Sequence, residues 1–104
     1  MKEARFYLVV RFRVEPQAVA RVLGWLDGGH VAEVIAQPGF LWCRRLRLGA
    51  HEFAMLYGIE SRAAFDAYEA NHALKAKFAR ERAPFEAHMT IERFTAEVDK
   101  TYDA

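Results

Sequence analysis

The sequence has one cysteine among its 104 residues. A single thiol cannot form a disulfide within the chain, and Cys43 has no neighbours at the spacing of a zinc site. Between Trp42 and Arg44, a lone cysteine is more often a small strand residue than a nucleophile. The cysteine content therefore excludes a disulfide-stabilised scaffold and indicates a reducing compartment.

Long hydrophobic runs are also missing. No stretch of about 18 apolar residues, the minimum for a transmembrane helix, occurs in the chain. The longest candidate, Phe6–Val10, has the length of a strand and is followed by Arg11 and Arg13. The residues before it do not form the apolar segment of a signal peptide. We therefore expect a cytoplasmic protein with no membrane partner.

Neither sign of charge is in excess, since 15 Lys and Arg face 14 Asp and Glu for a net charge of +1. A protein that neutralises a phosphate backbone is far more basic, so we expect no nucleic-acid partner. The sequence has no GxGxxG motif, no Walker loop, and no His, Asp and Glu at metal-ligand spacing. These absences predict neither a nucleotide cofactor nor a metal site.

Apolar side chains, in contrast, are abundant: 53% of the residues are hydrophobic, including 8 Phe, 4 Tyr and 2 Trp. A chain of 104 residues forms one domain, which we place at residues 1–104 with a core of about 5–98. A domain this small leaves about a third or more of its extended-chain surface exposed. The apolar excess therefore indicates a surface that another molecule covers.

Hydrophobic periodicity divides the chain into six elements. Residues 5–14, 40–48, 51–60 and 85–98 alternate as strands, whereas residues 16–37 and 61–83 have apolar side chains at helical spacing. Gly28-Gly29 interrupts the first helix, and Ser61 is the predicted N-cap of the second. The order β-α-β-β-α-β is ferredoxin-like. The predicted fold class is therefore α+β, with both helices on one face of a four-stranded antiparallel sheet.

Strict alternation assigns each strand residue to one face of this sheet. The apolar face of the first strand belongs under the helices, because its other face carries Arg5, Arg11 and Arg13. The opposite face is then uncovered and mixes apolar with polar residues: Tyr7, Val9, Leu41, Cys43, Ala54, Leu56, Thr90 and Phe94 with Arg11, Arg13, Arg45, Arg47, His88 and Glu92. We expect two copies to cover each other there, as a face-to-face homodimer that forms an α/β barrel. The arginines either form ion pairs across this dimer or attract an anion between the subunits.

Two motifs resemble a known superfamily. One is His30–Phe40, a helix that begins with histidine and leads into a Gly-Phe strand entry; the other is Ser61–Phe65 followed by Tyr68–Ala73. With the element order, they resemble the dimeric α/β-barrel superfamily, which includes antibiotic-biosynthesis monooxygenases, haem-degrading monooxygenases and muconolactone isomerases. Within it, a small family without an assigned function has the most similar pattern. The resemblance implies a pocket between helices and sheet that holds a flat hydrophobic ligand.

Alternation and the helix stripes place five side chains towards this pocket: Trp42, Arg44, Tyr57, Tyr68 and His72. We predict His72 as the general base, with Tyr68 and Arg44 orienting the ligand or stabilising an enolate-like charge. The predicted ligand-binding residues are Trp42, Tyr57, His30 and Trp25. Two alternatives stay open. His72 could be a helix-end histidine without a catalytic role, since the helix dipole favours its charged form there. His30 could hydrogen-bond a helix carbonyl instead of a ligand.

Three functions are compatible with these residues. The first is a cofactor-independent enzyme, monooxygenase-like or isomerase- or cyclase-like, that acts on a hydrophobic aromatic metabolite. The second is a non-catalytic dimer that binds a ligand or only stabilises a complex. The third is a haem-binding protein with His72 or His30 as the axial ligand. We take the enzyme as the primary hypothesis, because an aromatic pocket with a few convergent polar groups is the usual form of a small-molecule site.

Overall fold

One antiparallel sheet with the strand order β2-β3-β1-β4 forms the centre of the molecule. The computed structural model describes all 104 residues. Its elements, in chain order, are β1 (Phe6–Val14), a 3-10 turn (Pro16–Ala18), α1 (Val19–Trp25), a π-helical turn (Leu26–His30), α2 (Val31–Ile35), β2 (Phe40–Arg47), β3 (Glu52–Ile59), α3 (Arg62–Glu69), α4 (His72–Arg82), a 3-10 segment (Ala83–His88) and β4 (Met89–Glu97).

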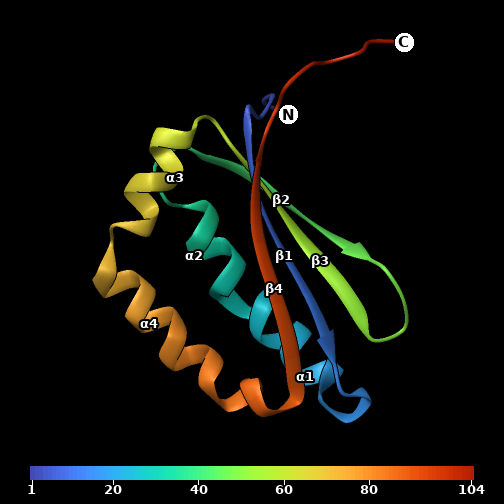
Figure 1. Ribbon diagram of the computed structural model, residues 1–104. Helices are drawn as coiled ribbons and strands as arrows, with labels where there is room; N and C mark the ends of the chain where they lie inside the picture. The colour runs from blue at the N-terminus through green and yellow to red at the C-terminus, as the bar shows by residue number, and fades with distance from the viewer.

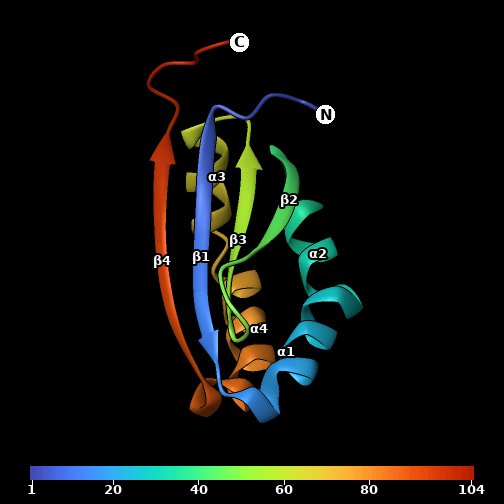
Figure 2. The same ribbon diagram turned by 90° about the vertical axis from the view of Figure 1, so that its right-hand side faces the viewer.

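The helices form a single layer on one face of this sheet, and the other face is open (Figures 1 and 2). Both termini lie at the same end of the sheet, and the residues after β4 extend beyond it (Figure 1). This arrangement confirms the predicted α+β ferredoxin-like fold. None of the helices combines the length and the apolar character needed to cross a membrane.

The helix-facing side of β1 is the floor of the core, as its alternation predicts. Phe6, Leu8, Phe12 and Val14 are buried, whereas Arg11 between them is exposed. The pairing of β1 with β3 and β4 extends this floor through Phe53, Met55, Tyr57 and Ile59 on one side and Met89, Ile91 and Arg93 on the other. The apolar face of the first strand therefore packs beneath the helices, as expected.

A β-bulge in β2 makes the predicted facing of that strand wrong. Phe40 pairs with Ile59, but Trp42 pairs with Gly58, so Leu41 is an extra residue and the alternation reverses after it. A Cβ on Gly58 would lie 2.4 Å from Cε2 of Trp42, so glycine leaves the space that the indole occupies. The bulge therefore turns three side chains to the open face, those of Trp42, Arg44 and Leu46. It turns three others to the helix side, those of Cys43, Arg45 and Arg47.

The helix expected over residues 61–83 is two helices, which changes the position of His72. Ser61 caps α3 as predicted, since its hydroxyl accepts a hydrogen bond from the amide of Ala64. Asn71 then caps α4 by accepting from the amide of Leu74. The new cap resets the helical phase, so His72 is the exposed first residue of α4 and does not continue the inner stripe. The last strand is also shorter than predicted, because residues 83–88 form a 3-10 segment.

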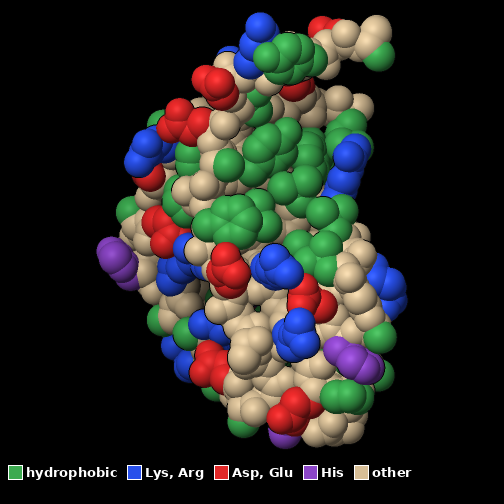
Figure 3. All heavy atoms as spheres, turned by 45° about the vertical axis from the view of Figure 1, so that its right-hand side comes forward, with side chains coloured by type: hydrophobic (Ala, Val, Ile, Leu, Met, Phe, Trp, Pro, Cys, Tyr) green, Lys and Arg blue, Asp and Glu red, His purple; other side chains and the backbone are tan.

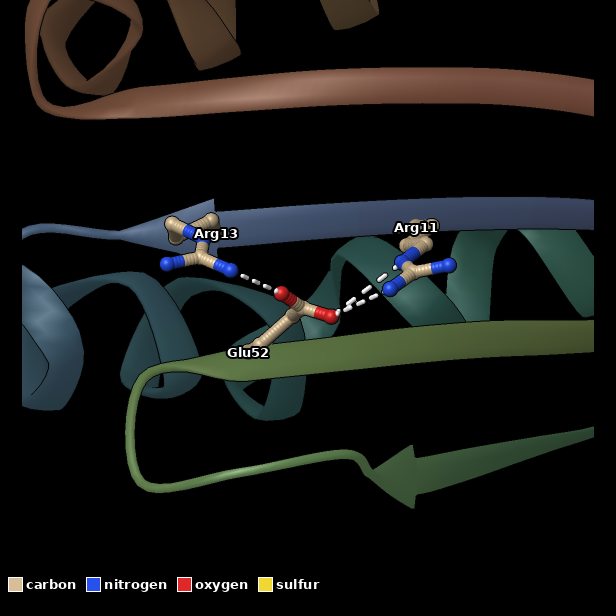
Figure 4. Close-up of polar contacts among 3 residues, drawn as sticks. All are labelled: Arg11, Arg13 and Glu52. Atoms are coloured by element: carbon tan, nitrogen blue, oxygen red, sulfur yellow. Dashed lines mark hydrogen bonds and ion pairs between the residues drawn. The ribbon is translucent and has the colours of Figure 1, made fainter.

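The open face of the sheet is divided into an apolar and a charged part. Figure 3 views this face obliquely, with hydrophobic side chains gathered in its upper half and charged ones below. The apolar part contains Tyr7, Val9, Trp42, Leu56 and Phe94. In the charged part, Glu52 accepts hydrogen bonds at 2.7 Å from both Arg11 and Arg13 (Figure 4).

The charged part of this face is balanced. Glu92 lies opposite Arg11 in the pairing of β1 with β4, so two carboxylates accompany two arginines. The two further arginines expected there, Arg45 and Arg47, lie on the helix side because of the bulge in β2. Arg44 turns to the open face instead and lies beside Trp42 in its apolar part. The expected excess of two arginines over Glu52 and Glu92 on this face is therefore reduced to one.

Candidate functional site

A cavity of about 350 Å³ lies between the helix layer and the sheet. This volume is within the range of small-molecule sites, which begins at about 300 Å³. Thirteen of its 18 lining residues are hydrophobic. The lining residues are Leu8, Val10, Phe12, Val22, Trp25, Leu26, His30, Val34, Met55, Tyr57, Tyr68, Glu69, Lys75, Phe78, Arg82, Met89, Ile91 and Arg93. The pocket expected between helices and sheet is therefore present within one chain.

The π-helical turn between α1 and α2 determines which residue of that segment faces the cavity. Its inward residues, Val22, Leu26, His30 and Val34, follow one another at intervals of four. A regular α-helix has about 3.6 residues per turn, so two turns after Val22 the residue that faces the cavity would be residue 29 rather than His30. The helix is kinked at Gly29 within this turn, and the kink adds the extra residue. Gly29 permits it with a φ of 147°, a conformation that side chains oppose.

His30 is held on the cavity wall by aromatic contacts. Its ring stacks on Trp25 with centroids 4.3 Å apart and meets the Phe78 ring edge-on at 4.7 Å. The buried Nδ1 has no hydrogen-bond partner. Burial lowers the pKa of His30 to about 4, with Arg82 and Lys77 contributing against Glu33. The imidazole is therefore neutral at pH 7 and has one nitrogen able to accept a proton.

Two tyrosines stand at the sheet side and the α3 side of the cavity. Tyr57 is buried on β3, opposite Cys43 of β2, and Tyr68 is buried on α3 with its ring 4.9 Å from Phe40. Burial raises the pKa of both phenols, so both remain protonated hydrogen-bond donors. Burial also raises the pKa of Cys43 to about 11, which makes the thiol a poor nucleophile at neutral pH.

The cavity has a charged side where β4 meets the helices. Arg93 of β4 and Lys75 of α4 both donate to the same carboxylate oxygen, Oε1 of Glu69, with Lys75 at 3.0 Å. Burial raises the pKa of Glu69, but the hydrogen bonds from these two cations outweigh it and leave the pKa lowered. Arg82 also lines the cavity and donates to Glu86 at 3.1 Å. Three elements, α3, α4 and β4, thus place ionised groups at one side of an apolar cavity.

Four of the seven predicted site residues line this cavity: Trp25, His30, Tyr57 and Tyr68. Trp42 and Arg44 do not, because the bulge at Leu41 turns them to the open face. There Trp42 packs on Tyr7 and donates from Nε1 to the carbonyl of Lys2 at 2.8 Å. The predicted orientation of these two residues was therefore wrong.

His72 lies outside the cavity as well, on the exposed start of α4. The catalytic role predicted for it stays a prediction, but the position beside the pocket on which it was based was wrong. Sequence analysis also missed Glu69, Lys75 and Arg93. A signal was available for one of them, since Arg93 is the first charged residue on the strand face that begins with the apolar Met89 and Ile91.

No three His, Cys, Asp or Glu side chains come together in a way that could hold a metal ion. The residues able to contact a bound molecule are instead the imidazole of His30, the two phenols, and the ions around Glu69. Such a site can bind a flat apolar molecule, donate to an oxygen on it and accept a proton from it.

Solved structures of other proteins have the same fold. SnoaB, a cofactor-independent oxygenase from Streptomyces nogalater, has a TM-score of 0.68 at 20% identity, over 94% of this chain and 96% of its own. MhuD, a haem-degrader from Mycobacterium tuberculosis that was solved with two haems in its active site, has a TM-score of 0.66 at 21% identity, over 94% and 99%. An antibiotic biosynthesis monooxygenase has a TM-score of 0.66 at 18% identity, over 93% and 99%.

These comparisons confirm, for the fold, the resemblance to antibiotic-biosynthesis-monooxygenase-like proteins. No family model matches the sequence, and no curated protein is similar to it.

Proposed function

We propose that this protein binds a flat aromatic metabolite in the cavity and acts on it without a bound cofactor, by removing a proton. The observation that carries this proposal is His30, a neutral imidazole with an unpartnered nitrogen on the wall of an aromatic cavity. Structural neighbours such as the oxygenase SnoaB support it by analogy of fold.

The proposed chemistry begins with transfer of a C–H or O–H proton from the ligand to His30. The bonding electron pair stays on the ligand as an enolate or phenolate, and a phenol such as Tyr68 donates a hydrogen bond to the resulting oxygen anion. The lowered pKa makes the imidazole a weak base in the empty cavity. An anion formed beside it raises that pKa, because opposite charge stabilises the imidazolium.

The deprotonated ligand then has two outcomes. In the first, its carbanion forms a C–O bond with molecular oxygen, and the resulting hydroperoxide loses water to leave a carbonyl; the ligand itself supplies the electrons, which is monooxygenase-like chemistry. In the second, it takes the proton back at another carbon, which is isomerase- or cyclase-like chemistry. Both need the same base and the same water-poor cavity, so His30 has one role in either case.

We further propose that the protein acts as a face-to-face homodimer. The open side of the sheet carries Tyr7, Val9, Trp42, Leu56 and Phe94. In one chain alone, Phe94 is 46% exposed. A contiguous apolar surface of this kind is typical of an interface. A second copy supplies the same surface, and the balanced group of Arg11, Arg13, Glu52 and Glu92 stays beside it.

A non-catalytic ligand-binding dimer is the alternative, and the same cavity supports it. Haem is a specific case of that alternative, because MhuD shares the fold and His30 presents a neutral imidazole that could ligate iron. Haemin titration separates this case: a Soret band that His30→Ala abolishes supports haem, and the absence of a band excludes it.

The test of the proposed function begins with native mass spectrometry of the purified protein, to identify a co-purified ligand. Turnover of that ligand is then compared between the wild type and the His30→Gln variant. Loss of turnover with retained binding supports the enzyme. Binding without turnover in the wild type, under oxygen, supports the non-catalytic alternative.

A further inference from the structure

The ionised groups on one side of the cavity are not balanced. Arg93 and Lys75 share a single oxygen of Glu69, so two cations face one carboxylate. Arg93 uses one of its five N–H donors in this contact. The remaining charge on this side of the cavity is therefore positive.

The environment of Lys75 indicates that the single carboxylate of Glu69 does not neutralise both cations on this side of the cavity. Its ammonium lies 4.8 Å from the centroid of the Tyr68 ring, at the cavity wall, and is 31% exposed. Burial lowers the pKa of Lys75, and the repulsion from Arg93 adds to this, so that the hydrogen bond to Glu69 does not restore the ordinary value. A second anion at this place would lower the cost of keeping both cations in a partly buried position.

The two cations come from different elements and meet at the carboxylate of Glu69. Arg93 projects from β4, Lys75 from α4, and Glu69 from α3, so they close the gap between sheet and helices beside an otherwise apolar lining. Arg82 is less available because Glu86, which does not line the cavity, accepts from its Nε.

We infer that the molecule bound in the cavity is an aromatic acid, whose carboxylate binds Arg93 and Lys75 while its ring packs among the apolar and aromatic side chains. This inference rests on the proposed function and narrows it to a class of ligand. A guanidinium offers a carboxylate two parallel hydrogen bonds, which a neutral amide of the same shape cannot match.

Two probes of the same shape test the inference: 2-naphthoate, which is an anion, and 2-naphthamide, which is neutral. Binding of each is measured by isothermal titration calorimetry at low salt. We expect the wild type to bind 2-naphthoate about tenfold or more tightly than 2-naphthamide, a difference of one charge-assisted contact. We expect Arg93→Gln and Lys75→Gln to remove most of this preference while the affinity for 2-naphthamide stays within about twofold.

The control variant is Arg80→Gln, which removes an exposed cation of α4 that does not line the cavity. It should leave the preference intact. Equal affinities of the wild type for the two probes, or an equal effect of Arg80→Gln and Arg93→Gln, would overturn the inference while leaving the proposed function in place. Failure of both probes to bind would contradict the proposed aromatic site itself. Thermal melting of each variant verifies that it is folded.

Discussion

Trp25 and His30 stack face to face, with ring centroids 4.3 Å apart and planes inclined by 23°, across a single π-helical turn. This stack orients the plane of the imidazole. Phe78 of α4 contacts the same ring edge-on from the other helix and holds it in place. The local geometry of residues 26–30 thus decides whether an imidazole faces the cavity.

Replacing Gly29 by alanine should destabilise the protein. Its φ of 147° is one that an alanine side chain opposes, at a cost of about 1–3 kcal/mol. Gly24 is the matched control, since it lies within α1 and a Cβ there meets nothing within 4 Å. Gly24→Ala should be neutral or stabilising by up to about 1 kcal/mol, because alanine favours a helix. Urea unfolding of both variants measures the difference, and equal effects would contradict the role assigned to the π turn.

Stability should depend on pH through His30. Its pKa in the folded protein is about 4, below the value of about 6.5 in an unfolded chain. Between these values the unfolded state binds the extra proton, so the free energy of unfolding falls as the pH falls from 6.5 to 4. His30→Gln removes this contribution. Urea unfolding at several pH values should therefore give a smaller loss of stability for the variant than for the wild type across this window.

A charge placed on the open sheet face should prevent dimer formation. Leu56 lies on the apolar part of this face, between Val9 and Arg44, so Leu56→Lys would bury an ammonium that has a like charge beside it in the proposed interface. Light scattering should give twice the chain mass of 12.0 kDa for the wild type and the single mass for the variant. The control is Ala73→Lys on the exposed surface of α4, which should remain dimeric. A wild type that is monomeric at micromolar concentration would contradict the dimer.

The two candidate bases can be compared directly by turnover of an identified ligand. His30→Gln should lower kcat by about 10²- to 10⁴-fold, the usual contribution of a general base. His72→Gln should leave kcat within about twofold, because His72 is exposed and does not line the cavity. The reverse result would restore the catalytic role that the sequence alone predicted for His72.

The strands and the order of elements along the chain follow from patterns that are local in sequence. The alternation from Phe6 to Val14 predicts both the strand and the face that packs under the helices, because one face is wholly apolar. Ser61 is likewise recognisable as a cap, since its hydroxyl bonds an amide three residues away. Features of this kind depend on neighbouring residues only.

The facing of Trp42 and Arg44 could not be predicted in the same way. It depends on one extra residue at Leu41, and the space for the indole is provided by Gly58 on another strand. His72 was misplaced for a similar reason, because Asn71 starts a new helix where the apolar stripe continued without interruption. A shift of one residue reverses a strand face or rotates a helix by about 100°, so a short local irregularity moves every later side chain.

The charged side of the cavity is a tertiary feature. Glu69, Lys75 and Arg93 come from three elements, and no spacing in the sequence indicates that they meet. Arg93 alone stands out, as the charge that follows the apolar Met89 and Ile91 on one strand face. His30 was recognised as a ligand-binding candidate, but its unpartnered nitrogen and lowered pKa follow from burial beside Trp25 and Phe78.

The most direct test is a long-range ¹H–¹⁵N spectrum of the histidine imidazoles during titration with 2-naphthamide. This neutral probe does not depend on the charged side of the cavity. With four histidines in the chain, the assignments are tractable. We expect the His30 ring nitrogens to shift with added ligand while those of exposed His72 stay in place. Shifts at His72 with none at His30 would contradict a ligand site in the cavity beside His30.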